Sequence, residues 1–175
     1  MAHLPNLTFV LGGASSGKSA FAEALVVQTG APRVYVATSQ VYDDEMAAKV
    51  RDHIDMRGAD WLTIEEPLDM QAALSQVGAD QVVLLDCASM WLTNHMMAEH
   101  DIEAETQSFI ESLAACNGRV VIVSNEVGMG IVPDNALARR FRIAQGKLNQ
   151  ELAAAADLAV FVIAGLPQVL KGQLP

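Results

Sequence analysis

"LTFVLGGASSGKSAFAEALV" (residues 7–26) joins an apolar run to a glycine-rich turn and then to a segment with helical spacing. Its central part, residues 12–19, matches the pattern G-x-x-x-x-G-K-[ST] between a predicted strand and a predicted helix. Glycines let the backbone curl so that successive N–H groups face phosphate oxygens, and the start of the helix adds a favourable potential. The order of strand, turn and helix therefore predicts a phosphate-binding loop.

The alternation of strand and helix patterns continues along the whole chain. We predict strands at 7–13, 33–39, 61–67, 81–86, 119–127 and 158–167, and helices at 18–30, 43–58, 68–78, 102–116 and 134–156. Near-continuous Val, Ile and Leu strands between helices predict an α/β fold, a mostly parallel P-loop NTPase-type sheet covered on both faces. We expect one domain over residues 1–175, with ligands bound beyond the carboxyl ends of the strands.

Composition narrows the classes of partner and compartment. A hydrophobic content of 51% with 18% charged residues argues against disorder. The formal net charge of −10 disfavours binding to nucleic acid or to an anionic membrane. Cys87 and Cys116 form no CxxC pair, and the chain shows neither a signal-peptide pattern nor a long apolar run. We therefore expect a cytoplasmic protein with reduced thiols and no membrane insertion.

The phosphate loop suggests specific roles for three side chains. Lys18 is expected to reach the β- and γ-phosphates of a nucleotide, and the Ser19 hydroxyl to coordinate Mg²⁺. Asp86 ends the run "VVLLD" and is a second candidate metal ligand, although aspartate is also common in turns after strands. Many functions share such a loop. A short acidic chain without an N-K-x-D motif favours a small-molecule kinase or a nucleotidyl transferase.

The segment "EMAAKVRDHIDMR" contains a histidine with two possible interpretations. Met46, Val50, His53 and Arg57 follow spacings of 4, 3 and 4, so they share one face of the predicted helix. His53 is either a reacting group or a half-buried histidine bonded to backbone, and periodicity alone favours the second.

Basic residues gather in the predicted helix 134–156, for which Asp134 is the expected N-cap. Arg139, Arg140, Arg142 and Lys147 are four of the eleven basic residues of the chain. Guanidinium groups suit phosphate binding, so they form either a site for a phosphorylated substrate or a solvated helix face.

Four blocks together resemble a known family, the bifunctional adenosylcobinamide kinase/adenosylcobinamide-phosphate guanylyltransferases of cobalamin biosynthesis. They are "LGGASSGKS", "YVATSQVYDDEMAAKVRDHIDMRGADWLTIEEP", "LLDCASMWLTN" and "VSNEVGMGIVPDNALARRFRIAQGKLNQELAAAAD". The resemblance covers nearly the whole chain, and "NEVGMGIVP" is its most specific part because no general nucleotide-binding rule explains it.

The resemblance implies a homotrimeric P-loop enzyme with two activities. The first phosphorylates the aminopropanol hydroxyl of adenosylcobinamide with ATP or GTP. The second transfers GMP from GTP to adenosylcobinamide phosphate, which gives adenosylcobinamide-GDP and pyrophosphate. His53 matches the family histidine that carries GMP as a phosphoramidate, a role that a neutral imidazole suits chemically.

The resemblance also extends the candidate site beyond the loop. Its catalytic residues are His53 and Lys18, and Ser19 and Asp86 would hold Mg²⁺. The full nucleotide-binding set comprises Gly12, Gly13, Ala14, Ser15, Ser16, Gly17, Lys18, Ser19, Ala37, Thr38, Ser39, Ile54, Asp55, Met56, Arg57, Glu65 and Asp86.

The chain departs from the family pattern at three positions. Ser15 stands where arginine is usual, Ile54 follows the histidine where a basic residue is common, and Ile143 replaces a carboxylate. These changes bear on nucleotide contacts and on the efficiency of the kinase step. His95 and His100 lie in the polar stretch "NHMMAEHD", which matches no family motif, and we expect both at the surface.

Two other functions stay open from the sequence. One is a P-loop small-molecule kinase in which His53 is structural, so that γ-phosphate is transferred without covalent GMP. The other is a nucleotide-binding regulatory subunit without turnover, which binds GTP and consumes none.

Overall fold

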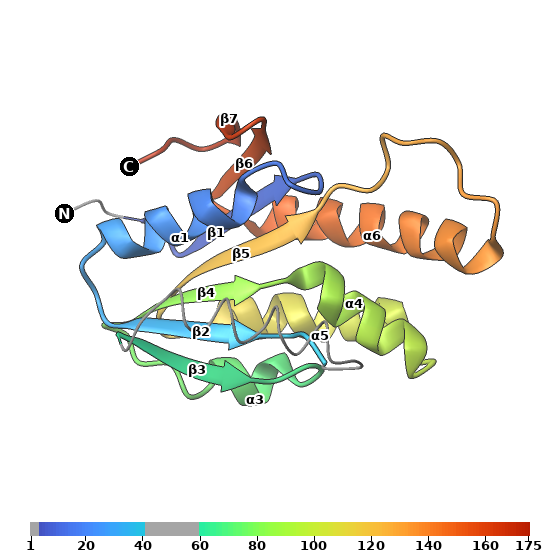
Figure 1. Ribbon diagram of the computed structural model, residues 1–175. Helices are drawn as coiled ribbons and strands as arrows, with labels where there is room; N and C mark the ends of the chain where they lie inside the picture. Colours follow the sequence, from blue (N-terminus) through green and yellow to red (C-terminus); the bar gives the residue numbers. More distant parts are fainter. Residues whose placement is uncertain (1–3, 41–59) are drawn as a thin grey trace.

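The computed structural model describes residues 4–40 and 60–175, which build a seven-stranded sheet in the order β3-β2-β4-β5-β1-β6-β7. Its strands are β1 (Leu7–Gly12), β2 (Arg33–Ala37), β3 (Trp61–Glu65), β4 (Val82–Asp86), β5 (Arg119–Asn125), β6 (Leu158–Ile163) and β7 (Leu166–Lys171). Its helices are α1 (Lys18–Gln28), α3 (Met70–Leu74), α4 (Ala88–Met97), α5 (Ile102–Ala115) and α6 (Ala136–Ala155). Figure 1 shows how they are arranged.

Every strand from β1 to β6 pairs in parallel, and β7 alone runs antiparallel to its neighbour β6. This confirms the predicted mostly parallel α/β fold. The predicted strand 158–167 is wrong in one respect, because the chain reverses within it. Ala164 (φ 52°) and Gly165 (φ 77°) both adopt left-handed backbone, the conformation of a tight hairpin turn.

Helices cover both faces of the sheet, as predicted (Figure 1). On one face, Leu25 and Val26 of α1 pack against strand residues such as Val10. On the other face, strand residues such as Phe9 pack against the helices α3, α4, α5 and α6. Side chains alternate between the faces along each strand, so a parallel strand that is covered on both sides must be apolar throughout. The predicted helix 43–58 lies outside the described residues.

Two helix starts differ from the predictions. The N-cap of α6 is Asn135, whose side chain accepts a hydrogen bond from Ala138 N at 2.7 Å, rather than Asp134. Helix α3 is shorter than the predicted 68–78, and the Asp69 carboxylate caps it by accepting from Ala72 N at 2.8 Å. Among residues 4–40 and 60–175, no helix combines the length and the apolar content that a membrane crossing requires.

Helix α4 was not predicted, and it overturns the surface placement of one histidine. His95 is only 2% exposed, and its ring lies 4.4 Å from that of Trp91 between centroids. Burial lowers the pKa of the His95 imidazole, against the opposing effects of the Leu68 carbonyl and the Glu105 carboxylate. His100, three residues beyond the end of α4, is exposed as expected.

Asn94 ties α4 to the ends of two strands. Its buried amide donates hydrogen bonds to the carbonyl oxygens of Thr38 at 2.7 Å and Pro67 at 3.0 Å. Thr38 directly follows β2, and Pro67 lies just beyond β3. One side chain therefore satisfies two carbonyls on neighbouring connections at the carboxyl edge of the sheet.

We expect Asn94→Ala to lower the free energy of unfolding by about 2–4 kcal/mol, because two buried carbonyls lose their donor and a cavity remains. Urea denaturation followed by circular dichroism measures this. Met97→Ala in the same helix is the matched control, since Met97 is 63% exposed and should cost less than about 1 kcal/mol. Equal effects of the two substitutions would contradict the anchoring role of Asn94.

Candidate functional site

The predicted phosphate loop has the expected local geometry. It runs between the end of β1 at Gly12 and the start of α1 at Lys18, so the first N–H groups of α1 face the loop. Ser16 N donates to Gly13 O at 3.3 Å, which curls the loop, and the ammonium of Lys18 donates to the same carbonyl at 3.0 Å. The lysine charge is thereby held over the concave side of the turn.

Two glycines of the loop are required by close contacts. A Cβ on Gly12 would overlap the Ser16 hydroxyl and would lie 2.8 Å from Val162 O. Gly17 has φ +91°, and a Cβ there would come within 3.0 Å of Gly165 Cα. Gly165 N also donates to Ser16 O at 2.7 Å. The hairpin turn between β6 and β7 thus braces the phosphate loop from outside.

The Ser16 hydroxyl is a buried polar group that lacks a partner. Ser16 is 8% exposed, and its Oγ makes no hydrogen bond within the part of the chain that the structure describes. Buried hydroxyls in folded proteins are normally paired, and an unpaired one calls for an explanation such as a missing ligand. A phosphate oxygen seated in the loop would supply the acceptor.

Three of the candidate residues stand side by side at the carboxyl edge of the sheet. The strand register places Ala37 of β2 between Glu65 of β3 and Asp86 of β4. Glu65 is exposed, whereas Ala37 is buried. The Tyr35 hydroxyl donates to the Asp86 carboxylate at 3.4 Å, which holds that side chain at the edge.

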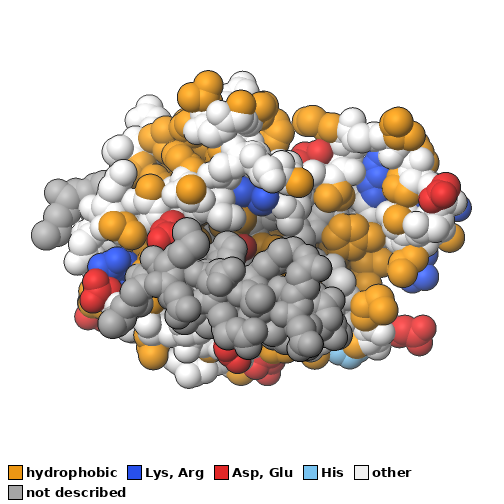
Figure 2. Space-filling view, viewed as in Figure 1, with side chains coloured by type: hydrophobic (Ala, Val, Ile, Leu, Met, Phe, Trp, Pro, Cys, Tyr) orange, Lys and Arg blue, Asp and Glu red, His pale blue; other side chains and the backbone are white. Residues whose placement is uncertain are grey.

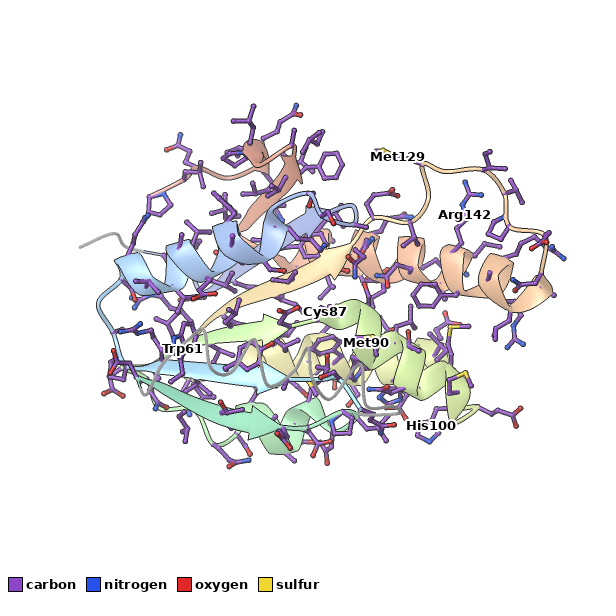
Figure 3. The ribbon with its side chains drawn as sticks, in the orientation of Figure 1. Trp61, Cys87, Met90, His100, Met129 and Arg142 are labelled. Carbon is purple, nitrogen blue, oxygen red and sulfur yellow. The ribbon has the colours of Figure 1, made fainter. Side chains whose placement is uncertain are left out.

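The thiol of Cys87 lies close enough to Lys18 and to Asp86 that both charges affect its pKa. Cys87 lies where β4 leads into α4 (Figure 3). Burial, together with the neighbouring Asp86 carboxylate, raises the pKa of its thiol to about 12, against the opposing effect of the positive charge of Lys18. Because both charges act on the same thiol, Lys18 and Asp86 belong to one electrostatic neighbourhood, as a nucleotide site with a metal would need.

Thr38 is held at the carboxyl edge of the sheet by several hydrogen bonds. It is fully buried, and its hydroxyl donates to Cys87 O at 2.7 Å and accepts from Cys87 N at 2.8 Å. Its own N–H donates to Asp86 O, and its carbonyl accepts from Asn94. Each polar atom of Thr38 therefore has a protein partner, and the residue positions the Asp86–Cys87 segment. Ser39, the next residue, is half-buried.

Five of the expected site residues lie outside the described residues. They are His53, Ile54, Asp55, Met56 and Arg57. The expected roles of these five residues remain predictions from the sequence.

The segment after β5 is folded on itself by two charged side chains. The Glu126 carboxylate accepts from Gly128 N at 2.7 Å and from Met129 N at 3.1 Å. Arg142 extends from α6 toward this loop and donates to the carbonyls of Gly128 and, at 3.1 Å, Gly130 (Figure 3). Both charges are therefore used to shape the "NEVGMG" turn.

A second arginine of the basic cluster has a similar role. Arg139 donates to Pro133 O at 3.0 Å and to Asp134 O at 2.6 Å. Arg140 and Lys147 are exposed. Arg139 and Arg142 thus bind carbonyls of the preceding loop. The two interpretations of the cluster, a site for a phosphorylated substrate and a solvated helix face, stay predictions.

A pocket of about 560 Å³ opens beside the phosphate loop. Its walls are Gly13–Ser16 of the loop, residues 126, 127, 129 and 130 after β5, and Phe161–Ala164 at the turn after β6. Residues 161–164 were missed as site residues. Their position follows from the pairing of β6 with β1, which is not visible in the sequence.

A comparison of the sequence with models of protein families found a match that covers the candidate site. A family model described as "Cobinamide kinase / cobinamide phosphate guanyltransferase" matches residues 8–170. The chain belongs to this family. The match includes the phosphate loop, the Asp86 edge and the "NEVGMG" turn, and it confirms the resemblance seen in the sequence.

Curated members of the family are similar over their full length. "Bifunctional adenosylcobalamin biosynthesis protein CobU" of Salmonella typhimurium is 42% identical, over 94% of this chain and 99% of its own. "Bifunctional adenosylcobalamin biosynthesis protein CobP" of Pseudomonas aeruginosa is 40% identical, over 94% of this chain and 96% of its own. The CobU protein of Escherichia coli is 39% identical over the same share of this chain.

Solved structures support the P-loop fold of this family member. The RadB recombinase superposes with a TM-score of 0.50 at 16% identity, over 89% of this chain and 73% of its own. A protein from Pyrococcus horikoshii superposes with a TM-score of 0.58 at 8% identity, over 95% of this chain and 86% of its own. An ATPase of a bacterial type III secretion system superposes with a TM-score of 0.52 at 8% identity, over 94% of this chain and 56% of its own. At such identities the likeness concerns the fold alone.

We expect Lys18→Ala to weaken GTP binding by about 10- to 100-fold, because it removes a charge-assisted hydrogen bond to phosphate. Isothermal titration calorimetry measures the affinity. Lys147→Ala removes an exposed lysine of α6 and is the charge-matched control. If both variants bound GTP as wild type does, the loop would not be the triphosphate site.

We expect Cys87 to resist alkylation in the folded protein. A thiol pKa of about 12 leaves about 1000-fold less thiolate near pH 8 than the ordinary value of 9.0. Burial also raises the pKa of Cys116, but this residue is only half-buried and should react first. Mass spectrometry after iodoacetamide treatment should show one adduct in buffer and two in denaturant, and rapid labelling of native Cys87 would contradict its burial.

Proposed function

We propose that this chain is a bifunctional transferase of adenosylcobalamin biosynthesis. It phosphorylates adenosylcobinamide with ATP or GTP and then transfers GMP from GTP to adenosylcobinamide phosphate, which releases pyrophosphate. The observation that carries this proposal is the family match over residues 8–170, together with full-length relatives that are named bifunctional. The phosphate loop, with Lys18 held over it, is the part of the geometry that such chemistry requires.

In the kinase step, the hydroxyl oxygen of adenosylcobinamide bonds to the γ-phosphorus while the bond from that phosphorus to the bridging oxygen breaks. The nucleoside diphosphate leaves with the electron pair, and the hydroxyl proton passes to solvent or a base. Loop N–H groups and the Lys18 ammonium oppose the charge that develops on the phosphate oxygens. Ser16, whose buried hydroxyl lacks a partner among the described residues, donates one further hydrogen bond.

Ser19 and Asp86 are the proposed ligands of Mg²⁺. A hydroxyl and a carboxylate are hard oxygen donors, which is the ligand chemistry that Mg²⁺ prefers in nucleotide sites. Tyr35 holds the Asp86 carboxylate at the sheet edge, and Ser19 lies in the first turn of α1. When bound, the ion supplies positive charge to the phosphates; the residues themselves orient and hold it.

In the guanylyl transfer, we assign the nucleophile to His53. An imidazole nitrogen bonds to the α-phosphorus of GTP while the bond from that phosphorus to the pyrophosphate oxygen breaks. An oxygen of adenosylcobinamide phosphate then bonds to the same phosphorus, the N–P bond breaks, and the neutral imidazole returns. Division of one transfer into two displacements is the general advantage of a covalent intermediate.

The remaining candidate residues form the proposed guanylyl nucleotide site. The residues that would line it are Ala37, Thr38, Ser39, Ile54, Asp55, Met56, Arg57 and Glu65. Thr38 would act through the Asp86–Cys87 segment that it positions. Glu65 stands in register with Ala37 at the same edge as Asp86. An exposed carboxylate there suits recognition of donor groups on a base or ribose.

We also propose a cytoplasmic homotrimer in which residues 1–175 form one domain. Figure 2 shows hydrophobic side chains over β6 and β7 and around the loop that precedes α6. Exposed apolar patches of this kind suit contacts between subunits. The exposed residues are Ile163, Leu166, Val169 and Leu170 on one side and Met129, Ile131, Val132 and Leu137 on the other.

Ser15 is the departure from the family pattern that bears most directly on the site. It is exposed in the phosphate loop with φ 55°, and a serine there reaches less far toward phosphate than the usual arginine. Ile143 is 64% exposed on α6, beside the arginines that shape the preceding loop. We propose that these changes affect nucleotide contacts and leave the two reactions intact.

We expect α-labelled GTP to leave label on the protein, acid-labile and base-stable as a phosphoramidate is, and we expect His53→Ala to abolish it. His3→Ala removes another histidine and is the matched control. Gel autoradiography after acid or base treatment measures the label. Undiminished labelling of His53→Ala would rule out this histidine as the carrier.

This assay, combined with γ-labelled GTP to follow phosphate transfer to adenosylcobinamide, separates the other functions that the sequence left open. Transfer of γ-phosphate to adenosylcobinamide without covalent GMP would indicate the plain kinase. Tight GTP binding without consumption, in the presence of adenosylcobinamide and its phosphate, would indicate a regulatory subunit.

A further inference from the structure

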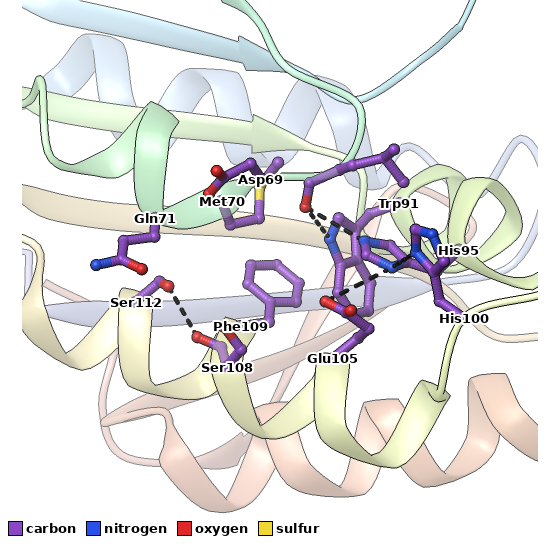
Figure 4. A pocket seen from close by; sticks show the side chains of 11 residues that line it. Asp69, Met70, Gln71, Trp91, His95, His100, Glu105, Ser108, Phe109 and Ser112 are labelled. Carbon is purple, nitrogen blue, oxygen red and sulfur yellow. Dashed lines mark hydrogen bonds and ion pairs between the residues drawn. The ribbon is translucent and has the colours of Figure 1, made fainter. Parts of the chain in front are cut away.

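A second cluster of reactive side chains lies among α3, α4 and α5, apart from the phosphate loop. It borders a pocket of about 350 Å³ that includes Leu68, Trp91, His95, His100 and Glu105 (Figure 4). No residue of the phosphate loop lines this pocket. Neither the proposed kinase step nor the guanylyl transfer uses these groups.

The buried His95 ring is fixed in one orientation and one tautomer. Its Nε2 lies 3.2 Å from Leu68 O, and a carbonyl oxygen only accepts, so Nε2 carries the proton. Trp91 packs against the ring in a tilted arrangement, with 47° between the two planes, and donates its own N–H to Leu68 O at 3.0 Å. The neutral ring therefore presents the lone pair of Nδ1 toward the pocket rim.

That lone pair faces two further ligand atoms, one from the turn after α4 and one from the start of α5. His100 Nδ1 lies 3.0 Å from His95 Nδ1, and Glu105 Oε2 lies 3.7 Å from it. The candidate ligand atoms of the three residues all fall within 4.8 Å of one another. Ligands at about 2.0 Å from a tetrahedral zinc ion are separated by about 3.3 Å, so the observed spacing brackets that value.

We propose that His95, His100 and Glu105 bind one divalent transition-metal ion of the zinc class, with a fourth position open to water. Two imidazoles and a carboxylate suit Zn²⁺, Co²⁺ or Ni²⁺ rather than Mg²⁺, which keeps all-oxygen ligands. The Leu68 carbonyl that holds the far nitrogen of His95 is the usual second contact of a metal-bound imidazole.

The fold indicates a structural role for this ion. His95 is in the last turn of α4, His100 is in the turn that follows, and Glu105 is in the first turns of α5. An ion held by all three would clamp the α4–α5 connection. Because His95 is buried and the other two are accessible, His100 and Glu105 can adjust around a fixed ligand.

The test uses the whole chain after treatment with chelator, without nucleotide or Mg²⁺. We expect isothermal titration with Zn²⁺ to show one site, and Co²⁺ to give the visible absorption of a four-coordinate ion. His100→Ala should weaken the zinc affinity by more than about 10-fold, and Glu105→Gln should do the same. His100 is exposed, so its replacement spares the core that His95→Ala would disturb.

Matched controls separate this site from adventitious binding. Glu103→Gln removes an exposed carboxylate from the same turn of α5, and His3→Ala removes another histidine; both should keep the wild-type affinity. At one Zn²⁺ concentration, the Tm of wild type should rise more than that of His100→Ala, because stabilisation by a ligand falls as its affinity falls.

Two results would overturn the proposal. One is the absence of saturable Zn²⁺ binding in wild type, which would leave a proton shared between the two imidazoles as the explanation of their short contact. The other is equal affinity in wild type and His100→Ala, which would place the ion elsewhere in the chain.

Discussion

The parallel pairing of β1 with β5 on one side and β6 on the other is the constraint on which the candidate site depends. It sets Gly12 in register with Asn125 and with Val162, so three connections leave the sheet at one point. The phosphate loop, the "NEVGMG" turn and the β6–β7 hairpin must then share a small volume. Gly12, Gly17 and Gly165 allow it, because a Cβ at either of the first two would meet backbone.

The other half of the edge depends on a small hydrogen-bonded network. Thr38 joins β2 to the Asp86–Cys87 segment, and Asn94 joins Thr38 to the connection after β3. These are buried polar groups, and each would be costly if left unpaired. Their mutual satisfaction fixes the Asp86–Cys87 segment at the carboxyl edge of the sheet.

The proposals for this chain place different chemistry in two groups of polar residues. Around the phosphate loop, oxygen donors and a lysine suit hard ions and phosphate. Between α4 and α5, two imidazoles and a carboxylate suit a softer ion. Arg139 and Arg142 have a third role. Their guanidinium groups donate hydrogen bonds to carbonyl oxygens of the loop before α6 and stabilise its conformation.

The sequence by itself determined the phosphate loop, most strands and the family, because these rest on local patterns: a turn with required glycines, apolar runs, and motif order. Tertiary structure decided the rest. Strand order brought residues 161–164 to the loop, and the fold brought the Leu68 carbonyl to the His95 ring, which is buried in a stretch whose letters look polar. Helix α4 escaped prediction for the same reason: its buried residues include Ser89, Asn94 and His95, whose polar atoms find partners only in the folded chain. Contacts between residues far apart in sequence carry no local signature, so their chemistry emerges only when the sheet is assembled.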